Sequence, residues 1–77
     1  MNWDDLRIFL AVARCGQLLA AARWLGLNHA TVARRLGALE EALAAKLVDR
    51  RTTGCVLTPA GEKFLETAER VEGEMLA

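Results

Sequence analysis

Residues 20–36 read AAARWLGLNHATVARRL and predict two helices joined by a tight turn. Ala22, before the turn, is small enough for the two helices to cross closely. Gly26 can adopt the positive φ of a sharp turn without steric cost. Val32 then anchors the second helix on its apolar side, so the polar side of that helix faces outward. A helix presented in this way can enter a major groove of DNA.

The second of these helices is the best defined by the sequence. Asn28 is expected to cap it, because its side-chain oxygen can accept a hydrogen bond from a free backbone N–H of the first turn. One apolar stripe follows at helical spacing: Val32, Leu36, Leu39 and Leu43. Arg34 lies on the opposite side of the helix and is predicted to point to solvent or to a ligand.

Two further helices are predicted before this one. Asn2 and Asp5 fit the cap and third positions of a first helix that Gly16 ends. Its apolar face is Trp3, Leu6, Phe9, Leu10 and Ala13. A short helix then runs from about residue 18 or 19 to residue 25.

A two-stranded hairpin is expected after the third helix, because short β-type runs occur at residues 47–48 and 55–57. The polar stretch between them, residues 49–54, contains Arg50, Arg51 and a turn glycine, which predicts a basic wing tip. Thr58 and Pro59 fit the cap and first position of a last helix.

Apolar residues of this last helix alternate at spacings of three and four, as in a coiled-coil seam. We expect it to form a homodimer interface of Phe64, Leu65, Ala68, Val71 and Met75. The alternative is that this face packs only on its own domain. No terminating residue precedes Ala77, which suggests a piece of a longer protein. The sequence thus predicts a mainly α fold, with a winged helix-turn-helix at residues 1–58 and a linker helix at residues 59–77.

Composition excludes several classes of function. The chain has 77 residues, one histidine and two cysteines that lie far apart, so it lacks a Ser/His/Asp set, a phosphate loop or a metal cluster, and we expect neither an enzyme nor a metal site. Cys15 and Cys55 are interpreted as free, buried or half-buried thiols, with a redox switch as the alternative. No apolar run approaches the about 20 residues needed to cross a membrane, and no secretion signal begins the chain, so we expect a cytoplasmic protein.

The net charge is zero, but its distribution is uneven. Residues 6–39 contain five arginines and no acidic residue, whereas residues 59–77 contain five glutamates, one lysine and one arginine. Such a basic body with an acidic tail favours a polyanionic partner.

In order and motifs, residues 3–76 resemble the N-terminal DNA-binding domain of LysR-type transcriptional regulators. The matching stretches are residues 6–13, 20–22 with Leu25, 32–43, 49–51 and 57–62. The resemblance implies a bacterial regulator that binds double-stranded DNA, dimerises through the linker helix and forms a higher oligomer in the full-length protein. It also implies that a small-molecule inducer binds an absent C-terminal domain, so no cofactor is expected here.

This chain departs from the family pattern at several places, which include Leu19 in the second helix and Val48 after Leu47. The glycine usual at the end of the third helix is Ala44, which costs roughly 1 kcal/mol if the backbone there has positive φ. The start of the recognition helix reads Asn28-His29-Ala30, so its base preference should differ from that of relatives with glutamine there.

Binding of DNA would divide the site residues into two groups. Base readout is assigned to the outward residues of the third helix: His29, Ala30, Ala33 and Arg34. Backbone contact is assigned to Asn28, Thr31, Arg35, Arg50, Arg51 and Thr53. Arg35 has no acidic residue three or four positions further on to pair with.

Two other interpretations remain open. Winged helices also serve as protein-interaction and dimerisation modules. The DNA-binding domain of molybdate-responsive regulators shares the winged fold as well, and the sequence beyond residue 77 would separate it from the LysR type.

Overall fold

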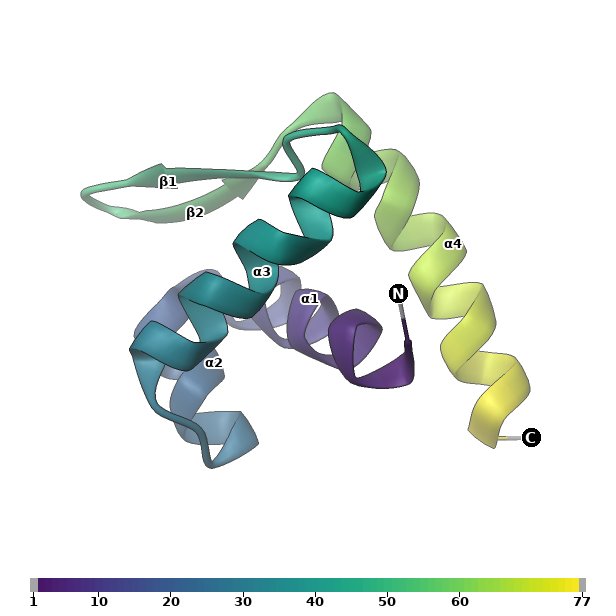
Figure 1. The fold of residues 1–77 in the computed structure, drawn as a ribbon, viewed down its shortest axis with the longest axis horizontal. Coiled ribbons are helices and arrows are strands. Elements are labelled where there is room, and N and C mark those ends of the chain that lie inside the picture. Colours follow the sequence, from purple (N-terminus) through teal and green to yellow (C-terminus); the bar gives the residue numbers. More distant parts are fainter. Residues whose placement is uncertain (1, 77) are drawn as a thin grey trace.

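The computed structural model describes residues 2–76, and its elements follow the predicted order (Figure 1). They are α1 (Trp3–Cys15), α2 (Leu18–Leu25), α3 (His29–Leu43), β1 (Val48–Arg51), β2 (Gly54–Leu57) and α4 (Pro59–Leu76). The predicted fold class, a helical core with a two-stranded wing and a long last helix, is confirmed. Met1 and Ala77, the outer ends of the two predicted segments, lie outside the described residues.

The helix ends lie where the capping residues predicted them. Asn2 and Asp5 form a reciprocal capping box at the start of α1. Gly16 and Gly26 end α1 and α2 with φ of 73° and 69°, so both use the left-handed conformation that glycine adopts freely. Asn28 caps α3, and its Oδ1 accepts a hydrogen bond of 2.8 Å from Ala30 N.

The core forms where the three helices of the head (residues 2–58) meet the base of the wing. α1 supplies its largest side chains, Ile8, Phe9 and Leu10. The predicted stripe of α3 faces them: Val32, Leu36 and Leu39 are buried, and Leu43 is half-buried. Burial of this stripe fixes the rotation of α3 and leaves its opposite side exposed.

The end of α3 carries local backbone strain. Ala44 has a φ of 52° and is the one non-glycine residue with positive φ among residues 2–76. A Cβ atom in this conformation crowds the backbone, which costs roughly 1–2 kcal/mol. The strain expected from the replacement of glycine by Ala44 is therefore present.

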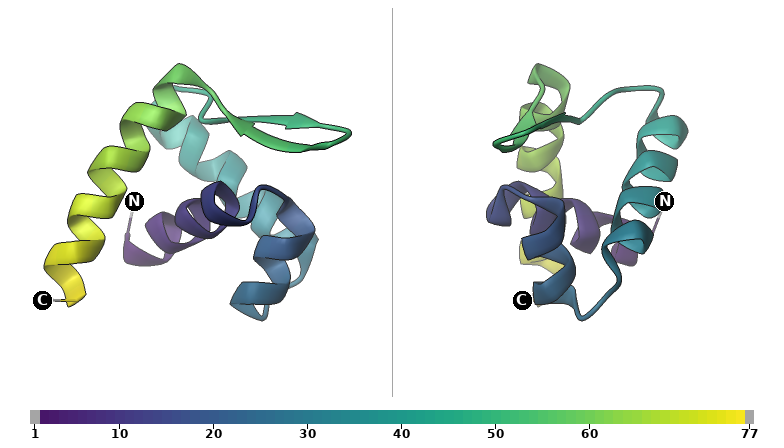
Figure 2. Two further views of the ribbon diagram at one scale, coloured as in Figure 1. Left: turned by 180° about the vertical axis from the view of Figure 1, so that it is seen from behind. Right: turned by 90° about the vertical axis from the view of Figure 1, so that its left-hand side faces the viewer.

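The wing is a regular antiparallel hairpin that projects from the helices (Figure 2). Arg51 pairs with Gly54, so only Thr52 and Thr53 form the turn. The predicted loop over residues 49–54 was too long, because strand pairing continues outward through both arginines. At the wing base, Cys55 N donates a hydrogen bond of 2.7 Å to the Gly16 carbonyl, which ties β2 to the corner between α1 and α2.

α4 begins at the predicted cap and lies close to the head. Thr58 Oγ1 accepts a hydrogen bond of 3.0 Å from Gly61 N. A Cβ atom on Gly61 would lie 2.0 Å from the Leu47 carbonyl oxygen. Only glycine therefore permits this approach of the helix to the chain before β1.

Part of the apolar seam of α4, which the sequence predicts to be a dimer interface, faces this chain's own core. Ala68 has an exposed fraction of 0%, so its side chain has no surface to offer a partner. The ring of Phe64 packs edge-on against Phe9 at 5.1 Å between centroids. Leu65 and Val71 are half-buried against the core, and Met75 is exposed. Periodicity identified the apolar face of α4 but not the surface that covers it.

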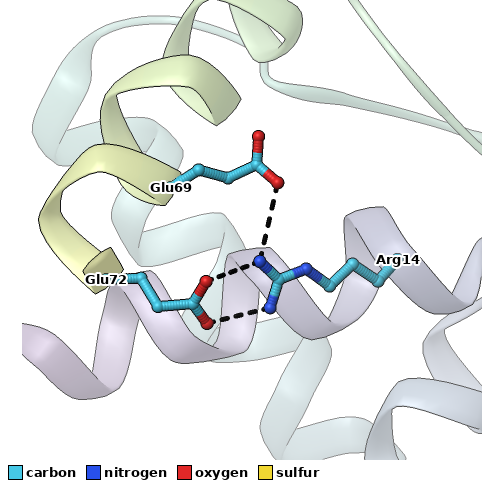
Figure 3. Close-up of polar contacts among 3 residues, drawn as sticks. All are labelled: Arg14, Glu69 and Glu72. Carbon is cyan, nitrogen blue, oxygen red and sulfur yellow. Dashed lines mark hydrogen bonds and ion pairs between the residues drawn. The ribbon is translucent and has the colours of Figure 1, made fainter. Parts of the chain in front are cut away.

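An ion-pair cluster joins the end of α1 to α4 (Figure 3). Arg14 donates two hydrogen bonds to the Glu72 carboxylate, at 2.9 and 2.6 Å, and its Nη2 lies 3.6 Å from Glu69 Oε2. The hydrogen bond from Arg14 lowers the pKa of Glu72, and the bond to Glu72 raises the pKa of Arg14. We call the bidentate Arg14–Glu72 pair the clasp.

Candidate nucleic-acid interface

The outer side of α3 is an exposed helical surface next to the wing. His29, Ala30 and Arg34 are exposed there, and Ala33 is half-buried. These four residues were predicted to read bases. Within residues 2–76, Arg34 has no acidic partner, so its guanidinium can donate two parallel hydrogen bonds to a ligand.

Ala33 lies on the flank of α3 that meets the wing. Its carbonyl oxygen accepts a hydrogen bond of 3.3 Å from Arg50 Nη2. This contact links the recognition helix to the hairpin 17 residues further along the chain. Part of the donor capacity of Arg50 is therefore used within the protein, which the sequence did not indicate.

Glu40 gives the wing a second attachment to α3. Its Oε2 accepts hydrogen bonds from the backbone N–H groups of Leu47 at 2.8 Å and Val48 at 3.1 Å. These groups begin β1, so Glu40 fixes where the wing leaves α3. Sequence reasoning missed this role, since the acceptor and donors are joined through a non-helical connection.

The start of α3 supplies backbone donors. The side chain of Asn28 is used for capping, and Thr31 is half-buried in the same turn. Free N–H groups and the positive end of the helix dipole favour an anion here. Asn28 is therefore better placed to hold the helix start than to donate from its own side chain.

A shallow hollow brings the wing and two helix starts together. It is lined by Gln17, Leu18, His29, Arg50, Arg51 and Thr52. Arg51 lies 3.5 Å from Asp49 Oδ2, and both side chains are largely exposed, so this pair is weak in water. Thr53 is exposed at the wing tip. Gln17, Leu18 and Thr52 were not among the predicted site residues, because their proximity depends on how the wing docks at Gly16.

Arg35 has an acidic partner on another helix, which the sequence of α3 alone does not reveal. Its Nη2 lies 3.8 Å from Asp5 Oδ1, and the guanidinium side chain is 35% exposed. The pair joins α3 to the start of α1. Because the Arg35 side chain is less exposed than that of Arg51, which is 60% exposed, Arg35 is a weaker candidate for phosphate contact.

Comparison with known proteins gives a consistent assignment. The profile of the family described as bacterial regulatory helix-turn-helix protein, lysR family, matches residues 3–62. The transcriptional regulator TfdS of Cupriavidus pinatubonensis is 44% identical over 71 residues, which is 92% of this chain and 24% of TfdS. ClcR of Pseudomonas putida is 42% identical over the same length, with 92% of this chain and 24% of ClcR covered. The chain thus spans about a quarter of these relatives, which are regulators and not enzymes.

Solved structures agree with this assignment. A structure of the CbnR DNA-binding domain in complex with DNA superposes with a TM-score of 0.93 at 37% identity, covering 97% of this chain and 86% of that one. The BenM DNA-binding domain, solved with benA site 1 DNA, gives 0.93 at 28% identity, covering 97% and 87%. No helix within residues 2–76 is long and apolar enough to cross a membrane. The chain belongs to the LysR family of bacterial regulatory helix-turn-helix proteins.

Proposed function

We propose that this chain binds double-stranded DNA in a sequence-specific manner to regulate transcription, with α3 in a major groove and the wing on the sugar-phosphate backbone. The observation that carries the proposal is the exposed outer side of α3, where Arg34 is free of acidic partners within the described chain and the wing arginines lie alongside. An α-helix fits the major groove, where each base pair presents a distinct pattern of donors and acceptors.

Base readout depends on the outward residues of α3. Arg34 can donate to guanine O6 and N7 together, a contact worth roughly 1–3 kcal/mol of discrimination. His29 can donate to or accept from a base edge. Ala30 offers a methyl group that suits the methyl of thymine, and Ala33, on the wing side, offers a smaller apolar surface.

Affinity depends mainly on phosphates. Arg51 and Thr53 are exposed on the wing, and Arg50 retains donors beyond the one bonded to Ala33. A second phosphate contact comes from the start of α3, where Asn28 caps the helix and its free backbone N–H groups can donate to an anion. The hydroxyl of Thr31 lies in the same turn. Arg35 contributes from the far flank once its distant pair with Asp5 opens.

The chain acts as a dimer in this proposal. α4 extends beyond the head and exposes Met75 and Leu76, while Leu65 and Val71 remain partly accessible. Two-fold pairing would place two α3 helices in successive major grooves, about one helical turn apart or a multiple of it. In the full-length bacterial protein, which we place in the cytoplasm as a higher oligomer, a small-molecule inducer would bind outside this domain.

Selection of bound sequences from a random duplex pool tests the proposal. We expect an inverted repeat with a guanine in each half-site. Titration of the selected duplex with salt should show a steep loss of affinity, because each phosphate contact releases a counterion. A chain that binds no duplex at low salt would instead act as a protein-interaction module, and this result would reject the proposal.

A further inference from the structure

Glu72 lies on the side of α4 that faces the head, at a position where helical periodicity predicts an apolar residue. Leu65 and Ala68 precede it at spacings of seven and four, which place all three side chains on one side of the helix. Leu65 and Ala68 pack on the core. A carboxylate follows them because the surface it faces is the guanidinium of Arg14 and not an apolar side chain (Figure 3).

Within residues 2–76, the clasp is also the last side-chain hydrogen bond between α4 and the head. Val71 is the final apolar side chain of α4 that packs against the core, and residues 73–76 are exposed. A hollow of about 370 Å³ lies beside the clasp and is lined by Arg14 and Glu72 together with Leu10, Ala11 and Trp24, among others. Close packing therefore holds α4 from Gly61 to Val71, and the clasp adds two hydrogen bonds at Glu72, directly after the last of these packed residues.

The packed start of α4 and the clasp hold this helix against the head at two separate places. Gly61 and Phe64 fix α4 near its start through Leu47 and Phe9. Glu72 lies eight residues beyond Phe64, about 12 Å along the helix at a rise of 1.5 Å per residue. Rotation of α4 about the packed end would move Glu72 away from Arg14, and the bidentate geometry resists such a rotation more than a single contact would.

We propose that the clasp sets the angle between α4 and the head, and thereby the distance between the two recognition helices of the dimer. Arg14 and Glu72 are then positioning residues that select the half-site spacing without touching DNA. The inference rests on the proposed function, because it requires a dimer that pairs through α4. A change of roughly 10° in the angle of α4 displaces Glu72 by about 2 Å over this 12 Å arm. The displacement becomes larger at greater distances from the packed end, and at the second recognition helix it approaches the rise of one base pair, about 3.4 Å.

The test compares spacing preference among charge variants. The selected half-site is placed as an inverted repeat in a duplex series whose centre-to-centre distance changes by one base pair, and a second duplex carries one half-site. For the unmodified chain we expect one preferred spacing, favoured at least tenfold over its neighbours. R14E places a third carboxylate beside Glu69 and Glu72, and should reduce this preference to about threefold or less. Affinity for the single half-site should stay within twofold.

Two controls separate the clasp from simple loss of charge. R14E/E72R exchanges the charges of the clasp and should recover most of the spacing preference. Arg23, exposed at the end of α2 and without an ion pair within residues 2–76, supplies the matched variant R23E, which should keep the preference. Hydrogen exchange of amides 72–76 should accelerate in R14E and slow again in the double variant.

The possible failures are distinguishable. If R14E keeps the full preference of the unmodified chain for one spacing, the inference is wrong while the proposed function stands. If R14E and R23E broaden the preference equally, the effect is one of net charge and the inference is also wrong. If the unmodified chain binds DNA with no spacing preference, the dimer proposal fails and the inference fails with it, even where exchange at α4 responds to the clasp.

Discussion

Arg50 of the wing donates a hydrogen bond of 3.3 Å to the carbonyl oxygen of Ala33 in the recognition helix. The wing and α3 are therefore a connected unit, further joined by Glu40 at the start of β1. Of the two wing arginines, Arg50 helps to hold this unit, whereas Arg51 extends into solvent with only a weak contact to Asp49.

The division between base-reading and backbone-contacting residues predicts distinct effects of two alanine substitutions on DNA binding. R34A should relax the preference at one base position by roughly 1–3 kcal/mol. R51A should weaken all duplexes similarly and reduce the slope of log affinity against log salt by about 1, since one phosphate contact is lost. Fluorescence anisotropy with the selected duplex and single-base variants measures both quantities.

R50A serves as the matched comparison for R51A. It should reduce the salt slope less, because part of Arg50 contacts Ala33 and not phosphate. Equal effects of R34A and R51A on all duplexes would contradict the division into base-reading and backbone-contacting residues.

A methyl group added at Gly61 should destabilise the fold, while the same change at Gly73 should stabilise it. A Cβ on Gly61 would lie 2.0 Å from the Leu47 carbonyl, and a Cβ on Gly73 has no neighbour within 4 Å. We expect G61A to lower the free energy of unfolding by about 3 kcal/mol through overpacking. G73A should raise it by about 1 kcal/mol through helix propensity. Urea unfolding measures the free energy of unfolding of both variants. A decrease of similar size in both would contradict the close approach of α4 to Leu47.

Relief of backbone strain at Ala44 should stabilise the chain. A44G places glycine at a φ of 52° and should raise the free energy of unfolding by about 1 kcal/mol. For a domain of this size, that gain corresponds to a Tm rise of about 4–8 °C. The control A42G makes the same chemical change at an exposed position of α3 with ordinary helical backbone. It should lower the free energy of unfolding by about 1 kcal/mol. A Tm that falls in both variants would be inconsistent with positive φ at residue 44.

The clasp should weaken in acid. The hydrogen bond from Arg14 lowers the pKa of Glu72 below its ordinary value of 4.5. A carboxylate with a depressed pKa stabilises the folded state above the ordinary value, and this contribution disappears as the pH falls through the depressed pKa. E72Q should therefore melt below the unmodified chain at pH 7, and the gap should close as the pH falls below 4.5 and through the depressed pKa of Glu72. E66Q removes an exposed carboxylate of α4 outside the clasp and should not produce the same difference in melting temperature. If the difference between E72Q and the unmodified chain persists at low pH, the charged pair is not its cause.

The helix boundaries could be predicted because their signals are local. Asn2, Asn28 and Thr58 each cap the residues that follow them, and Gly16 and Gly26 reverse the chain by their own conformational freedom. The apolar stripe of α3 likewise fixes which side of that helix is exposed. None of these features depends on residues far along the chain.

The contacts that shape the site depend on tertiary packing and could not be predicted. Arg14 and Glu72 are 58 residues apart, and Asp5 reaches Arg35 from another helix. The seam of α4 shows the same limit most clearly, since Ala68 fits a dimer interface and its own core equally well by spacing. The complete burial of Ala68 and the packing of Phe64 against Phe9 show that this part of the seam turns inward.

Methylation interference on the selected duplex tests the central claim most directly, because methylation at guanine N7 blocks the major groove and methylation at adenine N3 blocks the minor groove. We expect N7 methylation of one guanine in each half-site to abolish binding, and R34A to be insensitive to methylation of that guanine. Binding that tolerates N7 methylation throughout both half-sites would contradict the insertion of α3 into the major groove.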